Sequence, residues 1–187
     1  EISIEEIETI AEETDENSLI VVDEAYGEYS TNGSATKLLK DREDIAIIRT
    51  FSKAYGLAGC RVGYAIVPEE WSWCYAHVNT PFAVGELSCH AAIAALEDLD
   101  HTEETVELAM WARNYMRKNI KSKTWESQGN FILVEVGNAT EVSRHLENKG
   151  IMVRDCTSFG IPECIRITCG TKEQTRKVVE ELNDIIK

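Results

Sequence analysis

Residues 50–63 read TFSKAYGLAGCRVG and follow the short apolar run Ile45–Ile48. A continuous apolar run of this length is typical of a strand buried on both faces of a parallel sheet. Lys53 is therefore expected just past the end of a strand, on a glycine-rich turn. A lysine forms Schiff bases where burial or a neighbouring cation favours its neutral amine. The alternative is a solvated lysine on a flexible loop.

The residues around Lys53 suit an anionic ligand. Thr50 and Ser52 carry hydroxyl donors, and Arg61 has a planar guanidinium whose geometry matches phosphate. Glycines at positions 56, 59 and 63 allow the backbone to come close to a ligand. The segment thus combines a candidate nucleophile with a candidate phosphate site.

A carboxylate follows a second apolar run, Leu19–Val22, at the start of the sequence DEAY (residues 23–26). Ligands of open α/β sheets bind at the carboxyl ends of the strands, where Asp23 could hold a cationic group. The alternative is a helix cap or a loop acid. Pyridoxal phosphate needs a lysine, a partner for its pyridinium nitrogen and a phosphate-binding site. Asp23, Tyr26 and the lysine segment together provide residues of these kinds.

The apolar pattern predicts an α/β fold in two parts. Helices are expected at 3–13, 86–99, 102–121, 140–149 and 171–186, and strands at 19–22, 45–48, 62–67, 130–136, 151–154 and 164–168. The first three strands argue for a mostly parallel sheet covered by helices on both faces. The order strand, helix, strand, strand, helix in the last third indicates a small α+β domain. The division is expected within the long helix, so that residues 1–115 belong to a large domain and residues 116–187 to a small one.

Composition limits the possible partners. The chain has 187 residues, of which 43% are hydrophobic and 28% charged, as in globular proteins. Its net charge of −14 disfavours nucleic acid and anionic membranes as partners. No apolar run approaches the ~20 residues of a membrane span, and the first residues lack a signal-peptide pattern. The six cysteines form no C-x-x-C pair and the four histidines are scattered, so we expect no metal site and reduced thiols in the cytoplasm.

Five segments resemble one known family. DEAY at 23–26 and TFSKAYGLAGCRVGY at 50–64 resemble the fold-type I, pyridoxal phosphate-dependent aminotransferases of classes I and II. SQGNF at 127–131, GIMVRDC at 150–156 and CIRITCGT at 164–171 resemble signatures of the histidinol-phosphate aminotransferase branch. The resemblance covers essentially the whole chain. It implies the C-terminal half of the family's large domain, followed by the small C-terminal α+β domain.

The resemblance implies roles for the residues that match the cofactor motifs. Lys53 is the lysine that holds the cofactor covalently and moves the substrate proton. Asp23 pairs with the pyridinium nitrogen, and Tyr26 hydrogen-bonds the phenolic oxygen. The cofactor phosphate is held by Thr50, Ser52 and Arg61.

The resemblance also implies a substrate site. Arg166 matches the arginine that binds the acidic end of the substrate, and Arg154 reinforces this anion site. The alternative for Arg154 is a surface ion pair with Asp155 or Glu163. Asn130 either contacts the substrate or shapes the entrance of its strand.

The function that the resemblance implies is transamination of histidinol phosphate with 2-oxoglutarate, in a cytoplasmic homodimer. The substrates are then a small phosphorylated amine or amino acid and a 2-oxo acid. Threonine-phosphate decarboxylase of cobamide synthesis is the first alternative, and an aromatic amino-acid aminotransferase is the second. A non-enzyme alternative is an inactive remnant or interaction domain. Family chains are longer at the N-terminus, so we expect a truncated chain that is inactive alone.

Overall fold

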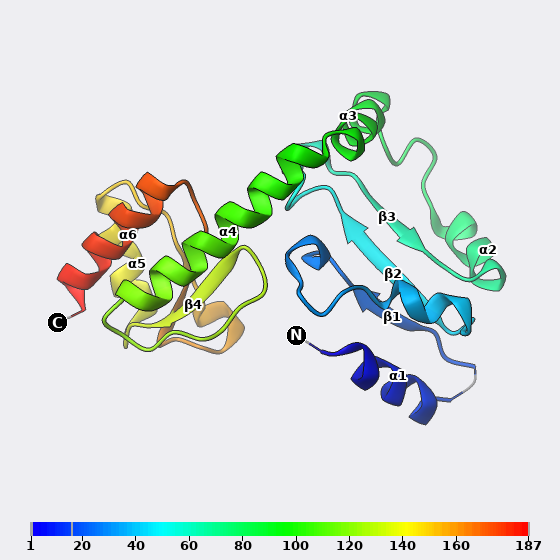
Figure 1. The fold of residues 1–187 in the computed structure, drawn as a ribbon, viewed down its shortest axis with the longest axis horizontal. Coiled ribbons are helices and arrows are strands. Elements are labelled where there is room, and N and C mark those ends of the chain that lie inside the picture. Colours follow the sequence, from blue (N-terminus) through cyan, green and yellow to red (C-terminus); the bar gives the residue numbers. More distant parts are fainter. Residues whose placement is uncertain (1, 16, 187) are drawn as a thin grey trace. The chain divides into compact units, whose positions relative to one another are not determined.

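The computed structural model describes residues 2–15 and 17–186, and it divides into two compact units, Glu1–Glu103 and Glu104–Lys187. The division falls within helix α4 (Leu99–Asn119), earlier in that helix than the predicted boundary after residue 115. Each unit contains its own three-stranded sheet. Figure 1 labels β1, β2 and β3 in the first unit and β4 in the second.

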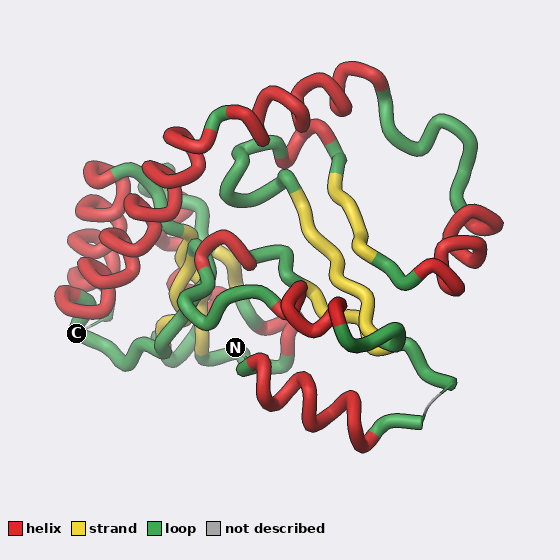
Figure 2. Tube along the Cα trace, turned by 45° about the vertical axis from the view of Figure 1, so that its right-hand side comes forward, coloured by secondary structure: helices red, strands yellow, loops and turns green. Residues whose placement is uncertain are grey.

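The first unit contains α1 (Ile4–Glu13), β1 (Ile20–Asp23), β2 (Ile45–Thr50), β3 (Gly63–Ile66), α2 (Glu69–Val78) and α3 (Glu86–Glu97). Short 3₁₀ helices form parts of the connections: η1 (Gly27–Tyr29), η2 (Ala35–Lys40) and η3 (Ala58–Cys60). The strands run side by side with β2 in the centre (Figure 2). β1 pairs with β2 in parallel, with Asp23 opposite Ile48. The carboxyl ends of β1 and β2 therefore lie at the same edge of the sheet.

One face of this sheet forms the core of the first unit. Ile45 and Ile47 on β2 are fully buried and cluster with Ala11 of α1 and Leu38 of η2. The predicted start of α1 is confirmed, because Ser3 Oγ accepts a hydrogen bond from the Glu6 N–H and Glu6 Oε2 accepts one from the Ser3 N–H. This reciprocal capping satisfies two N–H groups that the helix itself leaves unpaired.

Within this chain the outer strands of the sheet are less buried than their apolar sequences predict. β3 pairs with β2 in antiparallel fashion at the edge of the sheet, and all four of its residues are exposed. On β1, burial alternates, and Val21 is 55% exposed. An apolar run therefore does not by itself distinguish a central strand from an edge strand.

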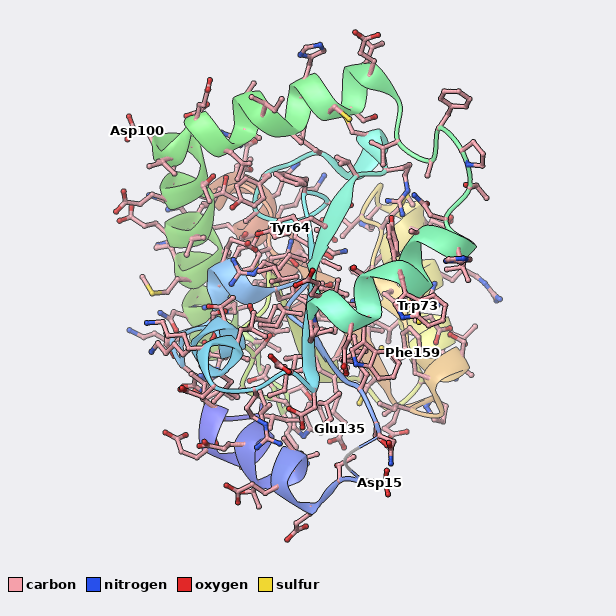
Figure 3. The ribbon with its side chains drawn as sticks, turned by 90° about the vertical axis from the view of Figure 1, so that its right-hand side faces the viewer. Asp15, Tyr64, Trp73, Asp100, Glu135 and Phe159 are labelled. Atoms are coloured by element: carbon pink, nitrogen blue, oxygen red, sulfur yellow. The ribbon has the colours of Figure 1, made fainter. Side chains whose placement is uncertain are left out.

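The apolar pattern also misses helix α2. Its sequence EEWSWCYAHV contains no buried residue, and Trp73 on this helix is 60% exposed (Figure 3). Pro68 at the N-cap and two glutamates in the first turn are the start signals that could have identified it.

The second unit contains the rest of α4, β4 (Phe131–Glu135), α5 (Ala139–Asn148), β5 (Arg154–Asp155), η4 (Thr157–Phe159), β6 (Cys164–Thr168) and α6 (Lys172–Ile185). Its sheet is antiparallel in the order β4-β6-β5. Buried side chains from α4, α5 and α6 pack against alternate residues of β4 and β6, including Met116, Leu146, Leu182, Ile132 and Ile165. Residues 131, 133, 154 and 166 belong to the other face of the sheet, because side chains alternate along a strand.

Most predicted elements of the second unit are confirmed. β6 has the predicted bounds, and α6 begins at the predicted capping box of Thr171 and Gln174. The predicted strand 151–154 is wrong except at Arg154, because the Ile151 N–H bonds back to the carbonyl of Leu146. Gly150, in a left-handed conformation with φ 73°, ends α5 in this way. In the described residues, no helix is both long and apolar enough to cross a membrane.

Candidate active site

The turn that follows β2 holds Lys53 in a fixed loop. The Phe51 N–H bonds to the carbonyl of Val62, and the Leu57 N–H bonds to the carbonyl of Phe51. Gly56 adopts φ +70°, and its N–H bonds to the carbonyl of Lys53. A side chain at position 56 would be strained at this φ, so glycine is what allows the turn. The backbone of the candidate lysine is therefore ordered by its own loop.

Tyr26 and Lys53 are brought together from two strands. The Lys53 Nζ lies 5.2 Å from the centre of the Tyr26 ring, which is a cation–π distance. Tyr26 follows β1 and Lys53 follows β2, so the parallel pairing of these strands explains the contact. Both side chains are half-buried.

Thr50, Ser52 and Arg61 also come together. The Thr50 Oγ1 accepts a hydrogen bond from the Ser52 N–H at 3.1 Å. The Arg61 Nη1 donates to the Ala58 carbonyl at 3.1 Å and lies 3.5 Å from the Ser52 Oγ. Arg61 has a left-handed φ of 49°, which turns the chain between η3 and β3. The result is a small group of hydroxyl and guanidinium donors, the chemistry that binds phosphate.

Asp23 lies at the end of β1, where its side chain is exposed. Its Oδ1 accepts a hydrogen bond from the Ala25 N–H at 2.9 Å, which shapes the turn that leads to Tyr26. The structure gives no direct contact between Asp23 and Lys53. The two residues share the same edge of the sheet because β1 and β2 are parallel.

Sequence reasoning misses an ion-pair network behind this edge. Arg49 donates to Glu24 Oε2 from Nε at 3.0 Å and from Nη2 at 2.7 Å. Arg49 Nη1 lies 3.9 Å from Glu28 Oε1, and burial raises the pKa of the Glu28 carboxyl. Tyr64, which is labelled on β3 in Figure 3, lies opposite Arg49 in the strand register. An arginine that directly follows the four apolar residues IAII of β2 is the signal that could have identified this network.

In the second unit, Arg154 and Arg166 lie directly opposite each other on β5 and β6. The guanidinium carbon of Arg166 is 5.0 Å from the centre of the Phe131 ring, and its Nε is buried without a hydrogen-bond acceptor among the described residues. The Arg154 Nη2 donates to the Ser158 Oγ at 3.1 Å, and its guanidinium lies over the Phe159 ring. Two arginines facing each other on one sheet face repel unless an anion lies between or beside them.

The structure gives no ion pair between Arg154 and a carboxylate among the described residues. Asp155 is instead hydrogen-bonded by Thr140 and by Thr157, and these bonds lower the pKa of the Asp155 carboxyl. The surface ion pair considered for Arg154 is therefore not formed with Asp155.

Asn130 lies immediately before β4, and its backbone carbonyl accepts a hydrogen bond from the Cys169 N–H at 2.7 Å. This bond places Asn130 beside the end of β6, and β6 is the strand that carries Arg166. The predicted residues thus form two groups, one in each unit. Lys53, Tyr26, Asp23 and the phosphate-type donors belong to the first, and Asn130 and the two arginines to the second.

Comparison with known proteins identifies the family. A family model described as aminotransferase class I and II matches residues 2–182. The chain is 55% identical over 186 residues to a histidinol-phosphate aminotransferase of Natronomonas pharaonis, covering 100% of this chain and 52% of that protein. It is 54% identical over 187 residues to the histidinol-phosphate aminotransferase of Haloarcula marismortui, with the same coverage. The chain thus spans about half the length of the curated relatives it matches.

A solved structure supports the same assignment. The histidinol-phosphate aminotransferase of Sinorhizobium meliloti, solved in complex with pyridoxal-5'-phosphate, has a TM-score of 0.85 and 26% identity to this chain. The match covers 98% of this chain and 53% of that one. The predicted fold class is confirmed by this likeness. The chain belongs to the class I and II aminotransferase family.

Proposed function

We propose that the protein to which this chain belongs transfers the amino group of histidinol phosphate to 2-oxoglutarate in histidine biosynthesis. The observation that carries this proposal is the pair Arg154 and Arg166, opposite each other on β5 and β6. A dianionic phosphate offsets the repulsion between them and provides an acceptor for the buried Arg166 Nε. The 54–55% identity to curated histidinol-phosphate aminotransferases supports the same substrate.

The first unit has residues that fit pyridoxal phosphate. The donor group of Thr50, Ser52 and Arg61 matches the needs of its phosphate. A side chain at position 59 would have no neighbouring atom within 4 Å of its Cβ, so the turn is open at Gly59. When bound, the cofactor supplies an aldehyde for attachment to a lysine and a ring that withdraws electrons from the substrate.

The roles of the chain's own residues follow from their positions. Lys53 would hold the cofactor covalently until the substrate amine replaces its Nζ. The freed Nζ would then take the proton from the substrate Cα and deliver it to the cofactor carbon that receives the amino group. Tyr26, whose ring lies 5.2 Å from that Nζ, donates its hydroxyl to the phenolic oxygen of the cofactor. Asp23 accepts a hydrogen bond from the protonated pyridine nitrogen and keeps it charged.

The second unit is proposed to bind the substrate. Arg154 and Arg166 bind the phosphate of histidinol phosphate, and Asn130 contributes a polar group beside them. We further propose that residues 1–115 belong to the cofactor-binding domain and residues 116–187 to a small domain. The whole protein is proposed to be a cytoplasmic homodimer. It is proposed to bind no metal ion, no nucleic acid and no membrane.

Decarboxylation of threonine phosphate is the second candidate. The arginine pair suits any small substrate with a terminal phosphate. An L-threonine-O-3-phosphate decarboxylase of Porphyromonas gingivalis has a TM-score of 0.82 and 22% identity, which is a likeness of fold alone. An aromatic amino-acid substrate would leave the facing arginines without a dianion, and is therefore disfavoured.

Two experiments test the proposal. In the first, this chain is incubated with pyridoxal phosphate and reduced with borohydride, and the modified lysines are mapped by mass spectrometry. A dominant adduct at Lys53, lost in Lys53→Ala and retained in Lys118→Ala, supports the cofactor site. Adducts spread over surface lysines contradict it for this chain.

In the second, the full-length protein is assayed with histidinol phosphate and 2-oxoglutarate, and separately with threonine phosphate. Formation of glutamate supports transamination, and release of carbon dioxide supports the decarboxylase. Replacement of Lys53 by alanine should abolish either activity. Turnover that survives Lys53→Ala would refute the proposed role of this lysine.

A further inference from the structure

Arg113 is a buried cation held by backbone carbonyls. It lies on α4 within the second unit and is only 8% exposed. Its Nη1 donates to the carbonyl of Gln128 at 2.8 Å and also to the carbonyl of Gly129. In the described part of the chain, no carboxylate forms an ion pair with it. A buried guanidinium normally has a carboxylate partner, so this arrangement needs an explanation.

The two carbonyls belong to the segment that leads into the predicted substrate site. The Ser127 Oγ accepts a hydrogen bond from the Gly129 N–H, which closes a tight turn. On the other side, the carbonyl of Asn130 accepts from the Cys169 N–H at the end of β6. Arg113 therefore fixes residues 128 and 129 from the helix, while the sheet fixes residue 130.

The next residue connects this segment to the arginine pair. Phe131 begins β4, and the centre of its ring lies 5.0 Å from the Arg166 guanidinium carbon. Arg166 in turn lies opposite Arg154 on β5. A short chain of contacts thus runs from Arg113 through the backbone of residues 128–130 to the Phe131 ring and the Arg166 guanidinium.

We propose that Arg113 is a positioning residue for the anion site of Arg154 and Arg166, acting through residues 128–131. The proposal rests on the proposed function of that site. By fixing two successive carbonyls, Arg113 sets where Asn130 and the Phe131 ring lie, and the ring sets where the Arg166 guanidinium lies. Arg113 itself does not contact the anion.

An apolar residue at position 113 would not fix residues 128 and 129. A methionine fills much of the volume of an arginine but donates no hydrogen bond, so the carbonyls of Gln128 and Gly129 lose their partner. A lysine keeps the charge and has three donors on its Nζ, but its flexible stem lacks the rigid guanidinium that directs both N–H groups of Arg113 Nη1 at the two carbonyls. Arginine should therefore fix residues 128 and 129 best, lysine less well, and methionine least.

Arg117 provides a matched control on the same helix. It lies one turn after Arg113, its side chain is 42% exposed, and its ion pair is with Glu126. Arg117→Met removes the same charge from the same helix without touching residues 128–131. Any general loss of positive charge is therefore measured by this variant.

The experiment measures binding of inorganic phosphate to the 187-residue chain by titration calorimetry, with thermal unfolding of each variant recorded in parallel. The variants are Arg113→Met, Arg113→Lys, Arg117→Met, Phe131→Leu, Arg166→Met and Arg61→Met. The last of these identifies any phosphate bound at the group of Thr50, Ser52 and Arg61, and that binding is subtracted before the variants are compared. We expect Arg113→Met to weaken phosphate binding roughly tenfold, by analogy with the lower end of the losses caused by removing groups that orient metal ligands. Arg113→Lys should recover part of the loss, and Arg117→Met should stay within about twofold of the unmodified chain.

The outcomes separate this inference from the proposed function. If Arg166→Met abolishes phosphate binding but Arg113→Met binds as well as Arg117→Met, the positioning role is refuted and the anion site stands. If the unmodified chain binds no phosphate, or Arg166→Met binds it unchanged, the proposed anion site fails. If Arg113→Met does not fold, Phe131→Leu decides: weaker phosphate binding with unchanged thermal stability supports the contact chain, and unchanged binding refutes it.

Discussion

Arg49 and Glu24 are joined by two hydrogen bonds, from Arg49 Nε and Nη2 to Glu24 Oε2, across 25 positions of sequence. Both side chains are largely buried, with 21% and 10% exposed. Glu24 also accepts from the Ser34 Oγ and the Ala35 N–H, so its carboxylate is satisfied on several sides. The pair connects the segment of Tyr26 to the strand that leads to Lys53, and it therefore supports the edge of the sheet that is proposed to bind the cofactor.

Replacement of Arg49 by methionine should destabilise the first unit strongly. It leaves the buried Glu24 carboxylate without its cation, and the loss is expected to be about 3 kcal/mol or more. Urea unfolding measures the difference. Arg117→Met, which breaks an exposed ion pair, should change the free energy of unfolding by less than about 1 kcal/mol. Similar losses in the two variants would contradict a supporting role for Arg49.

Glu28 should make stability fall as the pH rises. Burial raises the pKa of this carboxyl in the folded state, and neither of its oxygens accepts a hydrogen bond from the described residues. Between the unfolded pKa and the higher folded pKa, the folded state binds more protons than the unfolded state. The free energy of unfolding therefore declines as the pH rises through that window. Below the window Glu28 is protonated in both states, and its burial carries no cost of a buried charge.

Replacement of Glu28 by glutamine should remove this decline. The measurement is denaturant unfolding at a series of pH values from about 4 upwards. The exposed acid Glu43 supplies the control, because Glu43→Gln changes the net charge equally. An unchanged slope in Glu28→Gln relative to Glu43→Gln would show that Glu28 does not titrate in this window.

Gly63 should not tolerate a side chain. A Cβ at this position would lie 2.6 Å from the backbone carbonyl oxygen of Arg49, which cannot move without disturbing the pairing of β2 and β3. We expect Gly63→Ala to lose about 1–3 kcal/mol, the usual range for overpacking. Gly59→Ala is the control, because a Cβ there meets nothing within 4 Å. Equal stability of the two variants would contradict the close approach.

The cysteines should differ sharply in reactivity. Burial raises the pKa of the Cys169 thiol to about 11, and Cys156 and Cys164 are buried in the same unit. Because the thiolate is the reactive form, iodoacetamide at pH 8 should modify the exposed Cys89 first. Peptide mapping by mass spectrometry follows each site. Early alkylation of Cys169 in the folded chain would be inconsistent with the raised pKa of its thiol.

Local signals predict much of the fold. Capping boxes at Ser3 and Thr171 mark the starts of α1 and α6, and Gly150 marks the end of α5. These predictions succeed because each depends on residues within one turn of helix. The lysine segment is equally local, since Thr50, Ser52 and Lys53 are fixed by the strand end and by the turn at Gly56.

Long-range pairings are not predicted. The antiparallel direction of β3 and its exposure do not follow from its apolar sequence. The sequence also does not predict that Glu24 pairs with Arg49. Nor does it predict that Arg113 donates hydrogen bonds to the carbonyls of residues 128 and 129. In each case the partner is chosen by strand register or by helix packing, which an amphipathic pattern does not encode.

The sequence by itself therefore determined the family and the identity of the candidate residues, because motif chemistry is carried by short spacings. The tertiary structure alone decided that Arg154 faces Arg166 across β5 and β6, because register depends on how the intervening turn and the core pack. It likewise decided that Tyr26 meets Lys53, because only the parallel pairing of β1 and β2 brings the two strand ends to one edge.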